Sequence, residues 1–383
     1  MLENHVGNVQ LMQRLNRLKV LNIVRKHTTI QRADIARLSG LSLSSVTNIV
    51  NYLMSLGLIL DSARETEIHV GRKAAILEFN YAAYKFVCCA VTKSEIITVL
   101  CGLDGRIFDK CQADIPDGNE IEDVICRQTM EIINRNGRDR VLAVGIAISA
   151  MVTDGGNTVF SSSLGCSLHG FYDRIIAKVQ LPVIVENLSI TNAVYYADKK
   201  RFIDKKNLLF IDFIGGIGAV QLFCGEVNRA FAGEIGHTTI DPHSDEMCVC
   251  GNRGCLERLC SVERLMRLSG AHTIDDLVEK YKTGFKPAVD AVKECMEYLG
   301  ISVANLVDTL GPDRIILNGA DIFDSHEIYE LFISNVKNRA YGKLVEKTSF
   351  TLTHIENVEV ICGMALHLCD VVFDISFDKG IIE

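Results

Sequence analysis

Proline is scarce in this sequence, and long apolar runs and low-complexity tracts are missing from it. Only 5 of the 383 residues are proline, which argues against extended linkers between domains. No uncharged apolar run approaches the roughly 20 residues that a membrane-spanning helix needs, so we expect no membrane partner. The N-terminus lacks a basic segment followed by an apolar one, so no secretory signal is expected.

Cysteine, by contrast, is abundant, with 14 residues spread along the chain. Such a number suits a disulfide scaffold only in a small secreted domain. Cys88 and Cys89 lie next to each other in an apolar run, where thiols act as small core residues. We therefore expect a reducing, cytoplasmic location.

Charge is distributed unevenly along a chain that is long enough for two or three domains. The formal net charge is −8, but residues 1–80 carry ten Lys or Arg against six acids, which leaves −12 for the remainder. A basic head on an acidic body indicates that only the head meets a polyanion such as DNA. A basic surface is, however, also common as an ordinary solvated face.

Residues 1–80 show the pattern of a winged helix-turn-helix. Apolar spacing predicts helices over 11–26, 31–39 and 42–56, with a turn at Gly40, and strands over 58–60 and 75–79. In this fold the helix after the turn enters the major groove, and cations on the strand hairpin contact phosphates. A helical domain for protein contacts is the alternative. The candidate DNA-binding residues are Ser44, Ser45, Thr47 and Asn48 on the helix, and Arg72 and Lys73 on the hairpin.

From Phe86 onward, hairpins, apolar strands and helices alternate, which predicts an α/β fold of two lobes. A strand–turn–strand pattern opens near residue 86, and a second one, near residue 208, echoes it. Glycine-rich turns of the two lobes are expected to face each other across a cleft, a preferred position for ligands. Helices are expected over 120–136, 189–201, 261–268, 287–310, 326–341 and 363–372.

The run HTTIDPHSDEMCVCGNRGC contains one imidazole and three thiols, the ligand set of a closed tetrahedral zinc site. The predicted ligands of a structural Zn²⁺ ion are His237, Cys248, Cys250 and Cys255. His243 and Cys260 lie nearby and are expected to stay outside the site. Four protein ligands leave no open position, which disfavours zinc-activated hydrolysis.

These motifs resemble the ROK family (repressor, open reading frame, kinase). The resemblance rests on AGEIGH at Ala232–His237, CVCGNRGCLE at Cys248–Glu257, the run LPVIVEN and the N-terminal winged helix. It implies a DNA-binding head and an actin-like, hexokinase-type body. The expected boundaries are 1–80 for the head and 81–383 for the body, with lobes over 81–200 and 201–360 and a C-terminal helix, 361–383, that returns to the first lobe.

The same resemblance implies a sugar site in the cleft. Asn187, Glu234, His237 and Glu257 would face the sugar hydroxyls, with a zinc-fixed loop holding the carboxylates at one spacing. Glu257 also follows Cys255 closely enough to act as an ordinary residue at the start of a helix.

The sequence departs from the kinases of this family at the positions that perform phosphoryl transfer. The D-x-G-x-T phosphate turn is replaced by Ala90–Ser94, and the general base of the E-N-D motif is replaced by Leu188, which accepts no proton. The Gly-Thr-Gly phosphate turn of the second lobe is replaced by Ile214–Gly216. We therefore expect no catalytic residues and no enzyme activity.

Taken together, the sequence predicts a homodimeric, sequence-specific transcriptional regulator that binds a double-stranded DNA operator. We expect a repressor of carbohydrate-utilisation genes that is controlled by a carbohydrate effector in the cleft. Two alternatives stay open. One is an active ATP-dependent sugar kinase that also binds DNA, and the other is a constitutive DNA-binding protein with a vestigial pocket.

Overall fold

The N-terminal head packs three helices against a small sheet. The computed structural model describes residues 3–61, 76–115, 120–153, 158–161, 164, 166–199, 207–214, 216–319, 321–374 and 382. The head consists of α1 (Glu3–Arg25), β1 (Ile30–Gln31), α2 (Arg32–Ser39), α3 (Leu43–Ser55), β2 (Ile59–Asp61) and β3 (Ile76–Phe79), with strand order β1-β3-β2.

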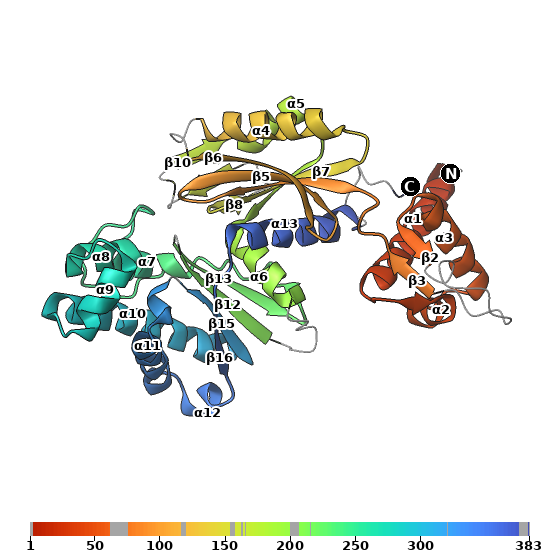
Figure 1. The fold of residues 1–383 in the computed structure, drawn as a ribbon. Coiled ribbons are helices and arrows are strands. Elements are labelled where there is room, and N and C mark those ends of the chain that lie inside the picture. Colours follow the sequence, from red (N-terminus) through yellow and green to blue (C-terminus); the bar gives the residue numbers. More distant parts are fainter. Residues whose placement is uncertain are drawn as a thin grey trace.

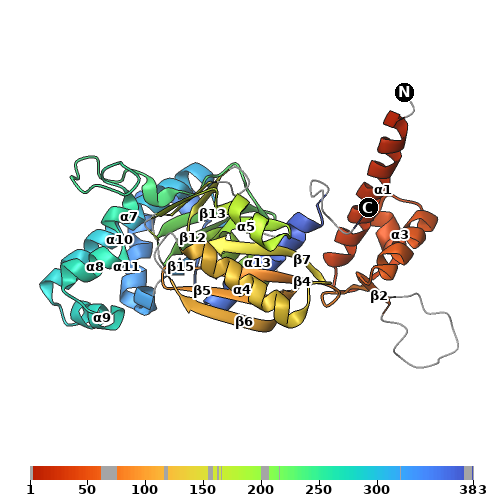
Figure 2. The ribbon, with the colours of Figure 1, turned by 90° about the horizontal axis from the view of Figure 1, so that it is seen from above.

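The turn between α2 and α3 is set by a glycine. Gly40 adopts a left-handed conformation with a φ of 72°, which ends α2 and redirects the chain toward α3. The Ser42 side chain then accepts a hydrogen bond from the Ser45 N–H and caps α3. Val46, Val50 and Leu53 bury one face of α3 in the head core. Helix α1 begins at Glu3 instead of near residue 11 and extends beyond the rest of the head (Figure 2).

The first lobe is built on a five-stranded sheet of order β11-β7-β4-β5-β6. Strands β4, β7 and β11 are parallel to one another, and β5 and β6 continue the sheet as antiparallel neighbours. A separate three-stranded sheet has the order β10-β9-β8. The elements are β4 (Lys85–Val91), β5 (Glu95–Gly102), β6 (Ile107–Asp114), α4 (Ile121–Asn136), β7 (Val141–Ile148), β8 (Met151–Thr153), β9 (Thr158–Ser161), β10 (Cys166–His169), α5 (Phe171–Val179), β11 (Val183–Asn187) and α6 (Leu188–Lys199).

The second lobe repeats this arrangement. Its sheet has the order β14-β13-β12-β15-β16, with β12, β15 and β16 parallel and with β13 and β14 antiparallel. The elements are β12 (Asn207–Phe213), β13 (Ile217–Phe223), β14 (Glu226–Val227), η4 (Ile235–His237), α7 (Leu256–Leu259), α8 (Val262–Ser269), α9 (Ile274–Lys282), α10 (Lys286–Leu310), β15 (Arg314–Gly319), η5 (Asp321–Asp324), α11 (His326–Arg339), α12 (Gly342–Val345), β16 (Ser349–Thr353) and α13 (Asn357–Val372).

The predicted two-lobed α/β body is confirmed, with differences in detail. Helix α13 begins at Asn357 instead of near Gly363. Helices α5 and α9 and the strands β8, β9, β10 and β16 were not expected from the sequence. These elements are short, and a short segment carries too few residues for its hydrophobic period to stand out.

Helices α6 and α13 lie between the two sheets (Figure 1). They approach very closely, because a Cβ added to Gly363 of α13 would stand only 2.0 Å from the Thr191 carbonyl oxygen of α6. The buried Asp212 of β12 reinforces this layer by accepting hydrogen bonds from Ser189 and Asn192 of α6 and from Asn318 of β15. Burial raises the pKa of Asp212, whereas these three donors lower it.

The far end of α13 reaches the head. The Arg25 guanidinium of α1 pairs with the Asp370 carboxylate, and the Asn22 side chain donates to the Phe373 carbonyl oxygen at 3.1 Å. The rings of Phe79 and Phe373 stack edge to face with centroids 6.0 Å apart. One apolar cluster therefore runs from the head, along α13, to the sheets of both lobes.

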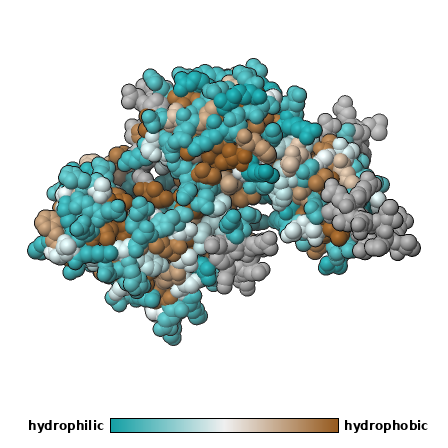
Figure 3. Space-filling model, viewed as in Figure 1, coloured by the Kyte–Doolittle hydropathy of each residue, from teal (hydrophilic) through white to brown (hydrophobic). Residues whose placement is uncertain are grey.

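The face of the molecule seen in Figure 3 is largely hydrophilic. Figure 3 shows hydrophobic residues in separate groups among hydrophilic ones on the visible face. Exposed aromatic residues include Phe108 and Phe223. Among the described residues, no helix combines the length and the apolar character required to span a membrane.

Glu186, at the end of β11, is a buried carboxylate that joins three parts of the body. Its Oε2 atom lies 3.1 Å from His367 Nε2 of α13 and 2.7 Å from Arg229 Nη1 of the second lobe. Burial raises the pKa of Glu186, but the hydrogen bond and charge of His367 and the charge of Arg229 outweigh it and bring the pKa below the ordinary 4.5. A carboxyl whose folded pKa is depressed stabilises the fold above its unfolded pKa. That stability is lost as the pH falls through the folded pKa.

We predict that Glu186→Gln lowers the free energy of unfolding near pH 7 by about 1–3 kcal/mol, because it removes a buried, charge-assisted pair. The deficit should shrink as the pH falls through the folded-state pKa of Glu186, where the wild-type carboxyl is itself protonated. Urea denaturation across this pH range measures both effects. Glu226→Gln is the control, since this exposed glutamate makes only a loose pair with Lys26 at 3.8 Å. Equal pH dependence of the two variants would contradict the prediction.

Candidate metal centre and interlobe cleft

The loop between β14 and α7 brings one histidine and three cysteines together. His237 ends the short helix η4, and two isolated bridges, Thr239 with Cys255 and Met247 with Arg253, fold the following chain back on itself. The imidazole and thiol donor atoms of the four side chains all lie within 4.8 Å of one another. The cluster found among the described residues consists of His237, Cys248, Cys250 and Cys255.

The spacing of these atoms fits a tetrahedral metal ion. Cys248 Sγ lies 3.5 Å from His237 Nδ1, and Cys250 Sγ lies 3.6 Å from Cys255 Sγ. A tetrahedral ion with metal–sulfur bonds of about 2.3 Å and a metal–nitrogen bond of about 2.0 Å places its ligand atoms roughly 3.5–3.8 Å apart. Burial and the neighbouring thiols raise the pKa of Cys255 to about 12 when no metal is bound. A divalent cation would therefore have to displace protons on binding.

The two nearby residues expected to stay outside the site are absent from this cluster. His243 lies at the loop surface. Cys260 follows α7, is fully buried, and has its Sγ atom 2.8 Å from Cys295 Sγ of α10.

Glu257 and Glu234 flank the metal loop. Glu257 lies on α7, two residues after Cys255, and its Oε2 accepts a hydrogen bond of 2.8 Å from the Ile217 N–H of the β12–β13 turn. Glu234 lies just before η4, with Oε2 4.0 Å from His237 Nε2. Burial raises the pKa of Glu234, His237 lowers it, and the charge of Glu257 raises it. The metal loop thus holds two carboxylates near each other.

Asn187 is placed differently from the three other candidate sugar residues. Its Oδ1 accepts from the Ser189 N–H at 2.7 Å, and its Nδ2 donates to the Ala150 carbonyl oxygen at 2.8 Å. Asn187 therefore caps α6 and ties it to the connection between β7 and β8. Leu188, which was expected to replace the kinase base, is the first residue of α6.

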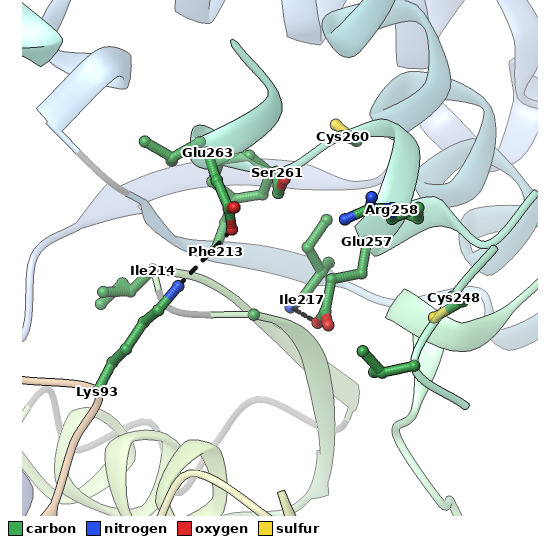
Figure 4. A pocket seen from close by; sticks show the side chains of 13 residues that line it. Lys93, Phe213, Ile214, Ile217, Cys248, Glu257, Arg258, Cys260, Ser261 and Glu263 are labelled. Carbon is green, nitrogen blue, oxygen red and sulfur yellow. Dashed lines mark hydrogen bonds and ion pairs between the residues drawn. The ribbon is translucent and has the colours of Figure 1, made fainter. Parts of the chain in front are cut away.

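A cavity of about 390 Å³ opens beside Glu257 (Figure 4). The β12–β13 turn forms one wall and the chain from α7 into α8 forms another. Lys93, from the β4–β5 turn of the first lobe, reaches across to Glu263 of α8, with Nζ 4.0 Å from Oε2. The sequence analysis located this turn, Ala90–Ser94, only as a replaced phosphate turn and did not name Lys93 as a ligand-facing residue, because its partner Glu263 is 170 residues away along the chain.

The candidate DNA-binding side chains lie on one face of α3. Ser44, Ser45 and Asn48 are exposed. The half-buried Thr47 donates its hydroxyl to the Leu43 carbonyl oxygen at 2.8 Å, so its polar group is already engaged. Arg72 and Lys73 lie outside the described residues.

Leu43 is a candidate contact that the sequence analysis missed. It is the first residue of α3, and it is 55% exposed although it is apolar. Apolar side chains at the start of a helix in the major groove contact thymine methyl groups.

Comparison with known proteins identifies relatives along nearly the whole chain. The sequence profile of the ROK family matches residues 88–370. A putative xylose repressor from a Caldicellulosiruptor species is 27% identical over 384 residues, which cover 93% of both chains. A crystal structure of a ROK family transcriptional regulator, a homologue of the E. coli Mlc protein, has a TM-score of 0.76 at 21% identity and covers 93% of this chain and 96% of its own.

A sugar kinase has a similar fold over about three quarters of this chain. The crystal structure of a ROK family glucokinase from Streptomyces griseus, in complex with glucose and AMPPNP, has a TM-score of 0.57 at 21% identity. The alignment covers 74% of this chain and 98% of that chain.

We predict that Cys250→Ser lowers the metal content of the purified protein, because a hydroxyl is a poor replacement for a thiolate ligand. Elemental analysis of protein prepared without chelators measures the metal bound per chain. Cys224→Ser is the matched control, since Cys224 is also exposed but lies outside the cluster. Equal metal content in the two variants would remove Cys250 from the ligand set.

Proposed function

The chain belongs to the ROK family, and from this premise we propose that it is a sequence-specific DNA-binding transcriptional regulator that represses carbohydrate-utilisation genes. The observation that carries the proposal is the match to a putative xylose repressor over 93% of both chains, head included. The fold of the body by itself does not distinguish a regulator from a kinase, since a glucokinase has a similar fold.

The exposed face of α3 supports DNA recognition by the head. Asn48 is the strongest candidate for base readout, because an amide side chain can bond an adenine edge with both of its polar atoms. Ser44 and Ser45 cluster with the cap residue Ser42, with hydroxyl oxygens 2.9 and 2.8 Å from that of Ser42. They suit contacts to phosphates near the start of the helix. Leu43 would contact a thymine methyl group.

A carbohydrate is the proposed effector, and it would bind between the lobes. Glu234 and Glu257 repel each other, so hydroxyl groups that donate to both carboxylates would relieve that repulsion. His237 would contribute both to the metal site and to the sugar site. Asn187 keeps lone-pair and N–H capacity for a sugar beyond its two bonds within the protein.

The metal is proposed to be a structural Zn²⁺ ion held by His237, Cys248, Cys250 and Cys255. A set of three thiolates and one imidazole suits Zn²⁺ better than Mg²⁺ or Ca²⁺, which prefer oxygen ligands. When bound, the ion would fix the loop that carries Glu257 and Glu234 on its two sides. The ion is proposed to have no direct part in chemistry.

The body is proposed to have lost kinase activity. Leu188 cannot accept the proton of a sugar hydroxyl. The second-lobe turn is also unsuited to phosphate, because Glu257 already occupies the Ile217 N–H and a Cβ at Gly216 would stand 2.7 Å from Glu257 Oε2. A carboxylate at the point where a phosphate would bind repels the nucleotide.

Helix α13 supports a route from the cleft to the head. It carries His367, which pairs with Glu186 at the interlobe layer, and Asp370, which pairs with Arg25 of α1. A ligand that favours one arrangement of the lobes by about 1–3 kcal/mol would shift the equilibrium between two orientations of the head by the same free energy. In a homodimer on a pseudo-palindromic operator, that shift changes the spacing of the two recognition helices.

We predict that the purified protein binds DNA from upstream of its own gene, and that a carbohydrate weakens this binding at least fivefold. Fluorescence anisotropy with labelled DNA, with and without a panel of mono- and disaccharides, tests both halves. Unrelated DNA of the same length is the control, and binding to it should be weaker and more sensitive to salt. Equal affinity for both DNAs would overturn the proposal of a sequence-specific regulator. The absence of a response to any sugar would overturn the proposal of a carbohydrate effector.

We predict that Asn48→Ala weakens operator binding about tenfold or more while leaving binding to unrelated DNA nearly unchanged, because a base contact carries sequence information and a phosphate contact does not. Ser55→Ala is the matched control, since Ser55 is exposed at the other end of α3 and bonds only its own helix, through the Tyr52 carbonyl oxygen. A uniform loss on both DNAs would place Asn48 at a phosphate instead.

A further inference from the structure

The cavity beside Glu257 spans the two lobes. Figure 4 shows Glu257 at one side and the Lys93–Glu263 pair at the other. Lys93 comes from the β4–β5 turn of the first lobe, whereas Glu257 and Glu263 belong to the second. A molecule that filled the cavity would therefore touch both lobes at once.

The cavity is larger than the space that one sugar unit at the four candidate sugar residues would fill. Of the four residues assigned to a sugar, Glu257 lines the cavity, and the space continues from there to α8. Its volume of about 390 Å³ falls within the range of roughly 300–1,000 Å³ that is typical of pockets for small molecules. A single sugar ring held by Glu234 and Glu257 would leave most of this space unfilled.

The charges of the lining favour a neutral ligand. Each of the two cations already faces a carboxylate, Lys93 facing Glu263 at 4.0 Å and Arg258 facing Glu246 at 3.2 Å. Glu257 adds a negative charge at the backbone turn and accepts the Ile217 N–H. An anionic group would displace one of these carboxylates or lie against one. Hydroxyl groups, by contrast, can donate to the carboxylates and accept from the cations.

Apolar side chains complete the lining. Ile214 is 49% exposed and Val249 is 62% exposed, and both line the cavity, together with the buried Phe213. Exposed apolar groups next to charged ones suit the two faces of a sugar ring, one of C–H groups and one of hydroxyls. Such a mixed lining is typical of a site for an uncharged ligand with many hydroxyls.

We propose that this cavity is a second saccharide subsite, and that the effector is a neutral disaccharide or a longer glycoside. The inference rests on the proposed sugar site at Glu234 and Glu257, which takes the first unit. The second unit lies along Ile214 and reaches Lys93 and Glu263. Hydrogen bonds from Lys93 and Glu263 to the hydroxyls of the second unit replace the ion pair between these two side chains. The second unit thereby connects the first lobe to the second.

Calorimetric titration of the full-length protein tests the subsite with D-xylose, D-glucose, xylobiose, cellobiose and glucose 6-phosphate as probes. We expect one of the disaccharides to bind at least tenfold more tightly than its monosaccharide. Tighter binding of a monosaccharide, or of glucose 6-phosphate, would overturn the second subsite while leaving the proposed sugar response intact. Failure of every sugar to bind would overturn the sugar response itself.

A substitution that fills the cavity distinguishes binding at the second subsite from binding at the first. Ile214→Trp should reduce the ratio of disaccharide to monosaccharide affinity from at least tenfold to about one, because the indole occupies the place of the second unit. Phe223→Trp is the matched control, since Phe223 is similarly exposed at the other end of β13 and should leave that ratio unchanged. An unchanged ratio in Ile214→Trp would overturn the proposal.

A second variant covers the case in which the tryptophan disturbs the turn. Lys93→Met keeps the length of an exposed side chain but removes its hydrogen bonds and its charge. It should lower disaccharide affinity at least threefold and monosaccharide affinity by less. Equal losses for both ligands would contradict a contact between Lys93 and the second unit.

Discussion

The close contact between α13 and α6 is the constraint on which the rest of the structure depends. Only a glycine at position 363 lets the two helices approach to this distance, since any side chain would collide with the Thr191 carbonyl oxygen. The pair forms the layer between two sheets of the same topology. Close-packed layers transmit displacement because they have few voids to absorb it. In the proposed regulation, a movement of one lobe would be carried along α13, whose end contacts the head through Asp370 and Phe373.

Glu257 connects the metal loop with the interlobe cleft. Cys255 is the N-cap of α7, and this places Glu257 in the first turn of that helix. The Glu257 carboxylate accepts a hydrogen bond from the Ile217 N–H. In a kinase, such a turn must present free N–H groups to phosphate oxygens. Here the same N–H is satisfied within the protein. The proposed replacement of the base by Leu188 and the occupation of this turn would be two independent obstacles to phosphoryl transfer, and together they support the proposal of a body that binds ligands without turning them over.

Much of the molecule could be predicted from the sequence because the relevant signals are local. The helical period of residues 42–56, the glycine after α2 and the apolar runs of the strands each depend on neighbouring residues, and the observed elements agree with them within a few positions. The four metal-loop residues were predicted for the same reason. Short elements such as α9 and β16 escaped, since their stability comes from packing against the second lobe and not from their own pattern.

The sequence by itself determined the family, the two-lobed α/β class and the identity of the clustered thiols and imidazole, because all of these are read from residue types at short spacing. Only the tertiary structure decided that Asn187 donates to the Ala150 carbonyl oxygen, that Glu186 meets His367 and Arg229, and that Lys93 faces Glu263 across a cavity. These partners are separated by tens to hundreds of residues along the chain. Their meeting depends on how the sheets and helices pack, which no local pattern of residues encodes.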